Sequence, residues 1–231
     1  MNKSEILDSI KHGLIVSCQA RKGWAMYGCD IMAAFAKAAQ EGGAVGIRAT
    51  GADNIAKIKR SVKLPIIGIN KQWINGCNVY ITPTYQSAEE ILRAGVEIIA
   101  LDATQRERPN KETYWQIQQK IREQYPDVCI MGEIATIEEA RQLIDMKPDL
   151  ISTTLSGYTD ESKNITSVNL ELIQQIRKLT DIPIIAEGKI RSEEEALAAL
   201  QAGAFAVVVG TSITRPEIIT SRYVEKLRKV Y

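Results

Sequence analysis

Lys71 and Glu187 are the two residues of this sequence best suited to moving a proton. Each ends an apolar run, in Gly68-Ile69-Asn70-Lys71 and in Ile184-Ile185-Ala186-Glu187. A lysine enclosed by low-dielectric walls has a lowered pKa, because burial disfavours its charged form. An amine of this kind, facing a carboxylate, suits the removal of a proton next to a carbonyl group. Taken singly, however, Lys71 is also compatible with a solvated loop lysine, and Glu187 with an ion-pair partner of a nearby cation.

Eight apolar runs must position these side chains, and most of the runs end at a polar or charged residue. The predicted strands are Leu14 to Gln19, Val45 to Arg48, Ile66 to Lys71, Ile98 to Asp102, Val128 to Glu133, Leu150 to Thr154, Ile184 to Glu187 and Ala206 to Thr211. Near-continuous apolar strands indicate burial on both faces, as in parallel sheets. The strand ends of a (β/α)8 barrel converge on one mouth, where active sites are built.

Helical patterns separate the runs. Asp30 to Glu41 and Gln86 to Arg93 both stop at glycines, and Thr136 and Ser192 each precede a helix start with a glutamate three residues on. An open doubly wound sheet is the competing layout. We favour one (β/α)8 (TIM) barrel domain over residues 1–231, because eight strand–helix units fill the chain and no GxGxxG turn follows an early strand.

Glycine-bearing turns follow the seventh and eighth runs, at Gly188 and at Gly210-Thr211. In barrels, the loops after strands 7 and 8 commonly hold a phosphate, because glycine lets backbone N–H groups approach an anion. Either glycine alone could merely permit a tight turn. The pair, joined by the cation of Arg215, predicts phosphate-binding loops after strands 7 and 8.

Four further polar residues end predicted strands. Gln19 and Arg48 are hydrogen-bond donors suited to a sugar or phosphate oxygen. Asp102 and Glu133 would anchor substrate hydroxyls or neutralise nearby cations. Arg48 could instead pair structurally with Glu133 or Asp102, since buried arginines usually need a carboxylate.

The charge composition argues against nucleic acid and acidic membranes as binding partners. Lys plus Arg number 29 against 28 Asp plus Glu, so no net field would hold nucleic acid or an acidic membrane surface. Strand-sized apolar stretches and a charged N-terminus predict a cytoplasmic protein without a membrane span.

The four cysteines form no CxxC pair and are expected to be free thiols. A metal site is disfavoured, because the single histidine, His12, precedes the first strand.

Seven sequence segments form an ordered set of motifs along nearly the whole chain. They are Gly13-Leu14-Ile15-Val16-Ser17-Cys18-Gln19-Ala20, Val45-Gly46-Ile47-Arg48-Ala49, Tyr80-Ile81-Thr82-Pro83-Thr84, Ile99-Ala100-Leu101-Asp102-Ala103-Thr104, Ser152-Thr153-Thr154-Leu155-Ser156-Gly157-Tyr158-Thr159, Ala186-Glu187-Gly188-Lys189-Ile190 and Val208-Val209-Gly210-Thr211-Ser212-Ile213-Thr214-Arg215-Pro216. This set resembles the N-acetylmannosamine-6-phosphate 2-epimerase family. Barrels in general share glycine-rich phosphate loops but not this ordered set.

The resemblance implies a cofactor-free enzyme of sialic-acid and amino-sugar catabolism that inverts carbon 2 of a sugar phosphate, N-acetylmannosamine 6-phosphate. It implies Lys71 and Glu187 as catalytic residues. Substrate contacts are expected at Gln19, Arg48 and Arg215, and phosphate contacts at the turns of Gly188 and Gly210. The exposed aromatics Trp24, Trp73 and Trp115 would offer contact surface for a homodimer.

Three departures from the family pattern leave the substrate open. The loop Arg21 to Cys29, which is expected to line the mouth, lacks the acidic, proline-containing segment of the family. Glu133 stands in place of an aspartate, and Asn70 replaces an aliphatic residue beside Lys71. An epimerase or isomerase of another sugar phosphate is therefore one alternative. A non-catalytic sugar-phosphate-binding protein is the other, and it would need a purely structural reason for keeping both Lys71 and Glu187.

Overall fold

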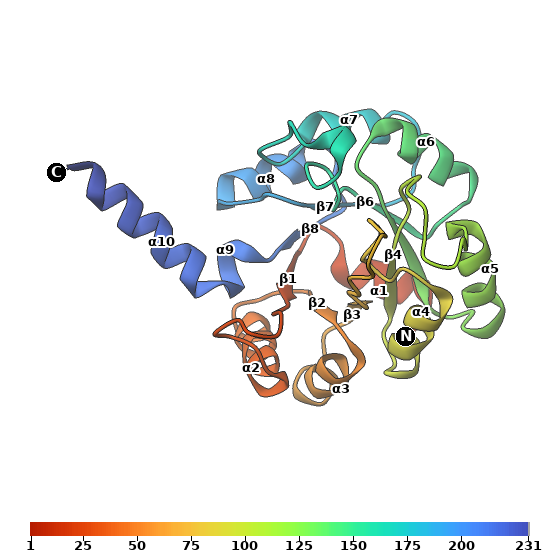
Figure 1. The fold of residues 1–231 in the computed structure, drawn as a ribbon, viewed down its shortest axis with the longest axis horizontal. Helices are drawn as coiled ribbons and strands as arrows, with labels where there is room; N and C mark the ends of the chain where they lie inside the picture. Colours follow the sequence, from red (N-terminus) through yellow and green to blue (C-terminus); the bar gives the residue numbers. More distant parts are fainter. Residues whose placement is uncertain (231) are drawn as a thin grey trace.

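Eight parallel strands close into a barrel in the computed structural model, which describes residues 1–230 (Figure 1). Each strand pairs with its neighbours in chain order, and β8 returns to β1. The strands are β1 (Leu14–Cys18), β2 (Gly46–Thr50), β3 (Ile66–Ile69), β4 (Ile98–Asp102), β5 (Cys129–Glu133), β6 (Leu150–Ser152), β7 (Ile184–Glu187) and β8 (Ala206–Val209). The predicted (β/α)8 barrel is confirmed, and every predicted strand is present with its ends displaced by two residues at most.

Helices alternate with the strands and form the outer layer. They are α2 (Cys29–Glu41), α3 (Ala52–Ser61), α4 (Tyr85–Arg93), α5 (Tyr114–Gln124), α6 (Ile137–Asp145), α7 (Leu170–Arg177) and α8 (Glu193–Gln201), with a 3-10 turn at Asp160–Ser162. Thr136 caps α6 in a capping box with Glu139, as predicted. Ser192 caps α8 through the N–H of Glu195, whose own carboxylate accepts from Arg191 N instead of completing a box with Ser192.

Two apolar clusters hold these layers together, because each strand buries both of its faces. Outward-facing strand residues such as Ile47 and Ile99 pack against the helices. Inward-facing residues such as Ile67, Ile98 and Met131 fill the barrel interior. The packed interior leaves the strand ends at one mouth as the place for a site.

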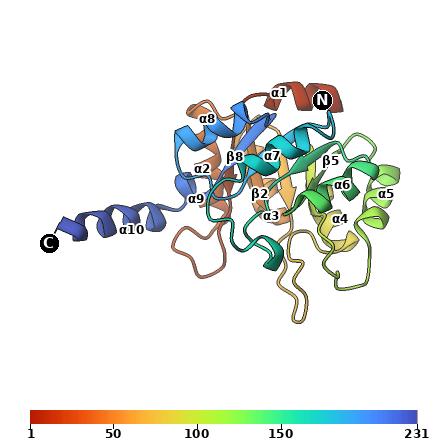
Figure 2. The same cartoon turned by 90° about the horizontal axis from the view of Figure 1, so that it is seen from above.

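Helix α1 (Lys3–Ile10) closes the opposite end of the barrel, and the sequence analysis did not predict it. Asn2 and Glu5 form a capping box at its start. Ile6 and Ile10 are buried in the same cluster as the barrel interior. Figure 2 shows α1 lying across the end remote from the strand-end loops.

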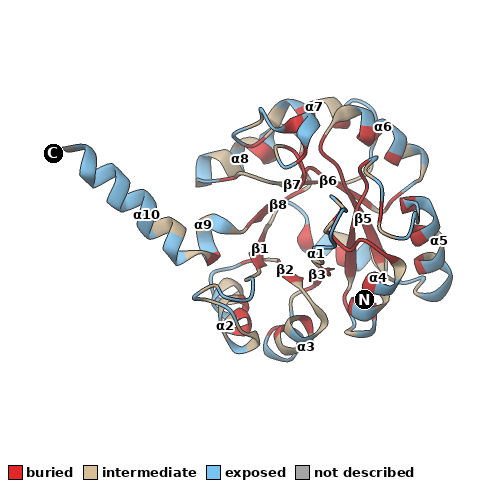
Figure 3. Ribbon diagram, in the orientation of Figure 1, coloured by how far each residue is buried: buried red, intermediate tan, exposed pale blue. Residues whose placement is uncertain are grey.

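The C-terminal helices follow β8 and leave the barrel. The short helix α9 (Thr211–Thr214) turns over the mouth, and α10 (Pro216–Leu227) then projects away from the body, followed by a 3-10 turn at Arg228–Val230 (Figures 1 and 2). None of the residues of α10 is buried, and the part of α10 that lies farthest from the barrel is exposed (Figure 3). Tyr223 and Leu227 are 72% and 68% exposed.

All four cysteines are free, as predicted, with Cys18 and Cys129 buried in strands. Within residues 1–230, the helices are too short and too polar to cross a bilayer.

Candidate active site

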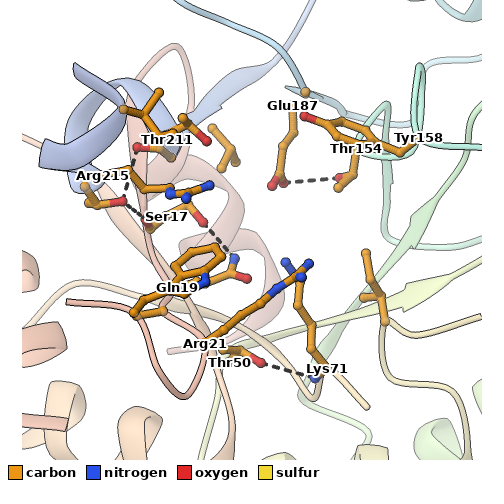
Figure 4. Close-up of a pocket in the computed structure, with 18 of the residues that line it drawn as sticks. Ser17, Gln19, Arg21, Thr50, Lys71, Thr154, Tyr158, Glu187, Thr211 and Arg215 are labelled. Carbon is orange, nitrogen blue, oxygen red and sulfur yellow. Dashed lines mark hydrogen bonds between the residues drawn. The ribbon is translucent and has the colours of Figure 1, made fainter. Parts of the chain in front are cut away.

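A cavity of about 670 Å³ opens at the mouth formed by the strand ends (Figure 4). It brings together residues from the loops after β1, β3, β7 and β8, which are far apart in the sequence. Seven of the predicted site residues line it: Gln19, Lys71, Glu187, Gly188, Gly210, Thr211 and Arg215.

Lys71 lies just beyond the end of β3. Its backbone N–H donates to Thr50 Oγ1 at 3.1 Å, and a bridge to Ile81 folds the following loop back over the barrel. The side chain lines the cavity. Burial, and to a smaller extent repulsion from Arg48, lower the pKa of the Lys71 amine to about 8, against the attraction of Glu187 and Glu133. A useful fraction of this amine is therefore an unprotonated base near neutral pH.

Glu187 ends β7, on the side of the barrel opposite β3. In Figure 4 its carboxylate and the Lys71 side chain extend into the cavity from opposite sides. Burial raises the pKa of Glu187 to about 7, although Arg48 favours the carboxylate. Each of the two residues also affects the pKa of the other. Amine and carboxyl group thus share one enclosed space, and both change charge close to pH 7–8.

Arg48 holds the carboxylates in place from beneath the cavity. The Arg48 side chain is 1% exposed; its Nη1 lies 2.5 Å from Glu133 Oε1 and its Nε 3.1 Å from Glu187 Oε1. Thr154 Oγ1 lies 3.2 Å from both Glu133 Oε1 and Glu187 Oε2, and its single proton can serve one of them at a time. Fixing Glu187 in this way keeps it aimed at the cavity.

Gln19 carries an unused hydrogen-bond acceptor. Its Nε2 donates to Ser17 Oγ at 2.7 Å, while its Oε1 is buried without a partner among the residues that the structure describes. A buried carbonyl oxygen without a partner is costly, so a donor from a bound ligand would stabilise it.

The loops after β7 and β8 supply an anion-binding side. Gly188 has a φ of +109°, which favours glycine, and Gly210 approaches Ser17 so closely that a Cβ atom would lie 3.1 Å from that side chain. Thr214 Oγ1 donates to Ser17 O at 2.8 Å, and Ser212 Oγ donates to Ile190 O at 3.1 Å. These bonds fix both glycine turns against the barrel, with their backbone N–H groups and Arg215 beside the cavity.

Comparisons with known proteins agree with this geometry. The family model described as "Putative N-acetylmannosamine-6-phosphate epimerase" matches residues 32–229. A protein of Caldanaerobacter subterraneus subsp. tengcongensis described as "Putative N-acetylmannosamine-6-phosphate 2-epimerase" is 44% identical, over 97% of this chain and 95% of its own length. A Listeria monocytogenes protein of the same description is 42% identical, over 98% and 97%. The chain belongs to the N-acetylmannosamine-6-phosphate 2-epimerase family.

Solved structures support the same assignment. The structure of the N-acetylmannosamine-6-phosphate 2-epimerase from Clostridium perfringens matches with a TM-score of 0.92 and 43% identity, over 95% of each chain. A thiamine phosphate pyrophosphorylase from Pyrococcus furiosus matches with a TM-score of 0.60 at 16% identity, and that likeness concerns the barrel fold alone.

Three of the residues predicted for the epimerase site lie outside the cavity wall. Arg48 and Glu133 form the buried pair beneath it, so the structure realises the predicted pairing of Arg48 with Glu133 and not the one with Asp102. The Asp102 carboxylate accepts from Thr104 through Oδ1 and from Arg106 Nη2, at 2.6 Å, through Oδ2. Glu133 Oε2 is buried without a hydrogen-bond partner within residues 1–230.

Other residues that line the epimerase cavity were not predicted as site residues. Arg21, Trp24, Trp73, Tyr80 and Tyr158 belong to this group. Trp24 and Trp73 were expected to offer contact surface, and both border the cavity, although Trp73 is 54% exposed. The loop Arg21 to Cys29 was expected to line the mouth, and Arg21 and Trp24 lie in the cavity wall as that prediction requires. For Trp73, its position in the loop after the third strand was the signal that could have identified it.

Asn70, one of the departures from the family pattern, turns toward α4. Its Nδ2 donates to Ser87 O at 3.1 Å and to Glu90 Oε2 at 2.7 Å. The amide therefore ties the end of β3 to α4, which steadies the backbone that carries Lys71.

Proposed function

We propose that this protein interconverts N-acetylmannosamine 6-phosphate and N-acetylglucosamine 6-phosphate by proton exchange at carbon 2, within amino-sugar and sialic-acid catabolism. The observation that carries the proposal is the placement of Lys71 and Glu187 on opposite sides of one cavity whose third side holds the glycine turns and Arg215. Family membership supplies the substrate.

The reaction begins with the open-chain aldehyde form, its phosphate at the glycine turns of Gly188 and Gly210. The Lys71 amine takes the proton from carbon 2, and the electron pair of the broken C–H bond forms a C1=C2 double bond while the carbonyl π electrons move to oxygen. The oxygen of the resulting 2-acetamido enolate gains a negative charge, which the cations around the cavity stabilise. A proton then returns to the opposite face of carbon 2, and the product differs from the substrate only in configuration.

Glu187 has one of two roles in the second step. A carboxyl group with a pKa of about 7 is partly protonated at neutral pH and is suited to deliver the proton. Alternatively, Glu187 orients Lys71 and the sugar while the lysine serves both faces. Gln19 Oε1, which is buried without a partner among the described residues, would accept from a hydroxyl or the acetamido N–H of the sugar.

Solvent exchange tests the mechanism. In deuterium oxide, the wild-type protein should place deuterium at carbon 2 of both sugars during turnover, and Lys71→Ala should abolish both exchange and epimerisation. Epimerisation over many turnovers without exchange would contradict deprotonation. Binding of the sugar phosphate without any turnover would instead support a binding protein.

A related sugar phosphate is the second candidate substrate. The loop after β1 departs from the family pattern and places Arg21 and Trp24 in the cavity wall. A panel of 2-acetamido and 2-hydroxy hexose 6-phosphates would decide between the two, since the better substrate has the larger kcat/KM.

We further propose that the protein works in the cytoplasm as a homodimer joined through α10. Tyr223 and Leu227 on this projecting helix are large, exposed and apolar, and Leu197 on α8 is 55% exposed. An isolated helix of this length gains little stability in water unless another surface covers it. Light scattering should give twice the mass of the 25.6 kDa chain, and Tyr223→Asp with Leu227→Asp should give the monomer. A monomeric wild-type protein would contradict the proposal.

A further inference from the structure

Aromatic and arginine side chains form a continuous stack along one wall of the cavity. The rings of Tyr80 and Trp73 are stacked with centroids 6.0 Å apart and 10° between their planes. The Arg21 guanidinium lies 4.3 Å from the Trp73 ring centroid and 5.5 Å from that of Trp24. Arg215 lies over the same Trp24 ring at 3.9 Å. The stack thus links the loops that follow β1, β3 and β8.

Trp24 is the centre of this stack, and its backbone is fixed. Trp24 N donates to Arg21 O at 3.0 Å, and Trp24 O accepts from Tyr27 N at 3.0 Å, so two consecutive turns share this residue. The indole is half-buried, and both the Arg21 and the Arg215 guanidinium lie near its ring. A rigid ring held by two turns is suited to orienting a flexible arginine, because a cation over an aromatic face is attracted to it.

The Arg215 guanidinium has protein contacts on two sides and faces the cavity with its Nη atoms. Trp24 covers the face of the guanidinium, and Nε donates to Glu217 Oε1 at 2.7 Å. Its Nη atoms, by contrast, make no hydrogen bond within the part of the chain that the structure describes. Figure 4 shows the side chain directed into the cavity, beside Thr211. The two Nη groups therefore present a ready pair of donors to an anion.

We propose that Trp24 is a positioning residue that holds the Arg215 guanidinium toward a bound phosphate group, with Arg21 tying Trp24 to the loop of Trp73. The inference rests on the proposed function, in which the phosphate of the substrate lies at the turns of Gly188 and Gly210. It assigns a role to the loop after β1, which carries both Arg21 and Trp24. That loop would set how strongly the site prefers a phosphorylated sugar.

The direct test is binding of inorganic phosphate to the full-length protein, measured by calorimetry for the wild type and for Trp24→Ala. Loss of the indole should raise the Kd for phosphate roughly 5- to 20-fold, the ratio expected for one partly desolvated cation–π contact. Trp24→Phe keeps an aromatic face and should stay within about 3-fold of the wild type. Trp115→Ala removes another partly exposed tryptophan, on α5 and outside the cavity wall, and should leave the Kd unchanged.

A double-mutant cycle shows whether Trp24 acts through Arg215. In an Arg215→Ala background, Trp24→Ala should cause no further loss of phosphate affinity, because the group that it positions is already gone. In turnover of N-acetylmannosamine 6-phosphate, Trp24→Ala should raise KM with little change in kcat.

Three results would overturn the inference: an unchanged phosphate Kd in Trp24→Ala, an equal further loss in the Arg215→Ala background, or a fall in kcat of Trp24→Ala with no change in KM. Failure of the proposed function looks different. A wild-type protein that binds phosphate but does not epimerise the sugar would overturn the activity, and the calorimetric comparison of the Trp24 variants would still decide the role of Trp24.

Discussion

Arg48 and Glu133 form an ion pair that is closed off from solvent beneath the cavity, with Nη1 of the arginine 2.5 Å from Oε1 of the glutamate. The same guanidinium reaches Glu187, so one buried cation faces two carboxylates. Lys71 stands close enough for its pKa to respond to all three groups. Charge balance at this site therefore depends on Arg48, and the reactivity of Lys71 and Glu187 follows from it.

Removal of Arg48 should destabilise the fold more than loss of a surface cation. Arg48→Met leaves the buried carboxylates of Glu133 and Glu187 without their cation, which costs about 3–5 kcal/mol in comparable buried pairs. Urea unfolding at pH 7 would measure the change. Arg48 lowers the pKa of Glu187, so this pKa should rise in Arg48→Met. The free energy of unfolding of Arg48→Met should therefore decrease more steeply with rising pH than that of the wild type.

A second substitution checks the origin of that loss. Glu133→Gln in the Arg48→Met background removes one unpaired carboxylate and should recover part of the free energy of unfolding. An Arg48→Met protein as stable as the wild type would show that the buried pair is not needed for the fold.

Lys71→Met should abolish epimerisation and yet stabilise the protein. The folded-state pKa of Lys71 is lowered to about 8, chiefly by burial, so the charged amine costs free energy below pH 8. That cost fades as pH rises from about 8 to the unfolded value near 10.4, because the amine is then neutral in the folded protein. The gain from Lys71→Met should be about 1–3 kcal/mol at pH 7 and should shrink above pH 8. Thermal unfolding at pH 7 and pH 10 would show this; destabilisation at pH 7 would contradict it.

The strands and the polar residues at their ends could be predicted because each apolar run stops at a side chain that cannot be buried alone. In a closed barrel that rule places Lys71 and Glu187 at one mouth without further information. Which cation pairs with which carboxylate could not be predicted in the same way. Asp102 and Glu133 occupy neighbouring register positions, yet Arg106 neutralises one and Arg48 the other. Loop conformation decides this choice, and no residue spacing encodes it.

Helix α1 was missed because it lies before the first strand, outside the strand–helix alternation on which the prediction rested. A helix after the eighth strand was part of that alternation, but the projection of α10 away from the barrel was not predicted. Ile6 and Ile10 are single apolar residues among charges, and only the barrel end that they cover explains them. The stack around Trp24 escaped prediction because it joins three loops, whose contacts depend on the closed barrel and not on periodicity.

Gly188→Ala should weaken phosphate binding and destabilise the fold. The φ of +109° is strained for an L residue, and an added Cβ would lie 3.3 Å from Thr154 O, so a loss of about 1–3 kcal/mol is expected. KM should rise because the turn that meets the phosphate must shift. Gly43→Ala is a matched control: its φ is +90° and its added Cβ has no neighbour within 4 Å among the described residues. That variant should lose stability without any change in KM. Equal KM values for the two variants would argue against a phosphate site at Gly188.

The pH dependence of kcat/KM should reveal the cation of Arg21 beside Lys71. Burial and then Arg48 lower the pKa of Lys71 to about 8, and Arg21 adds a smaller repulsion in the same direction. The base must be neutral, so the rate should rise with pH along an acidic limb that ends near pH 8. Above that pH the rate should stay level if Lys71 serves both faces, and fall if Glu187 delivers the proton. Arg21→Leu removes a repulsion, raises the pKa of Lys71 and should move the acidic limb to higher pH.

The rate of Arg21→Leu should therefore fall at pH 7 and match the wild type near pH 9.5, where Lys71 is neutral in both proteins. Added salt should shrink the difference, because Arg21 is exposed and its field is screened. Arg141→Leu, which removes an exposed cation on α6, should leave the limb in place. A shift of equal size in both variants would assign the effect to net charge, and a shift toward lower pH in Arg21→Leu would contradict the repulsion between Arg21 and Lys71.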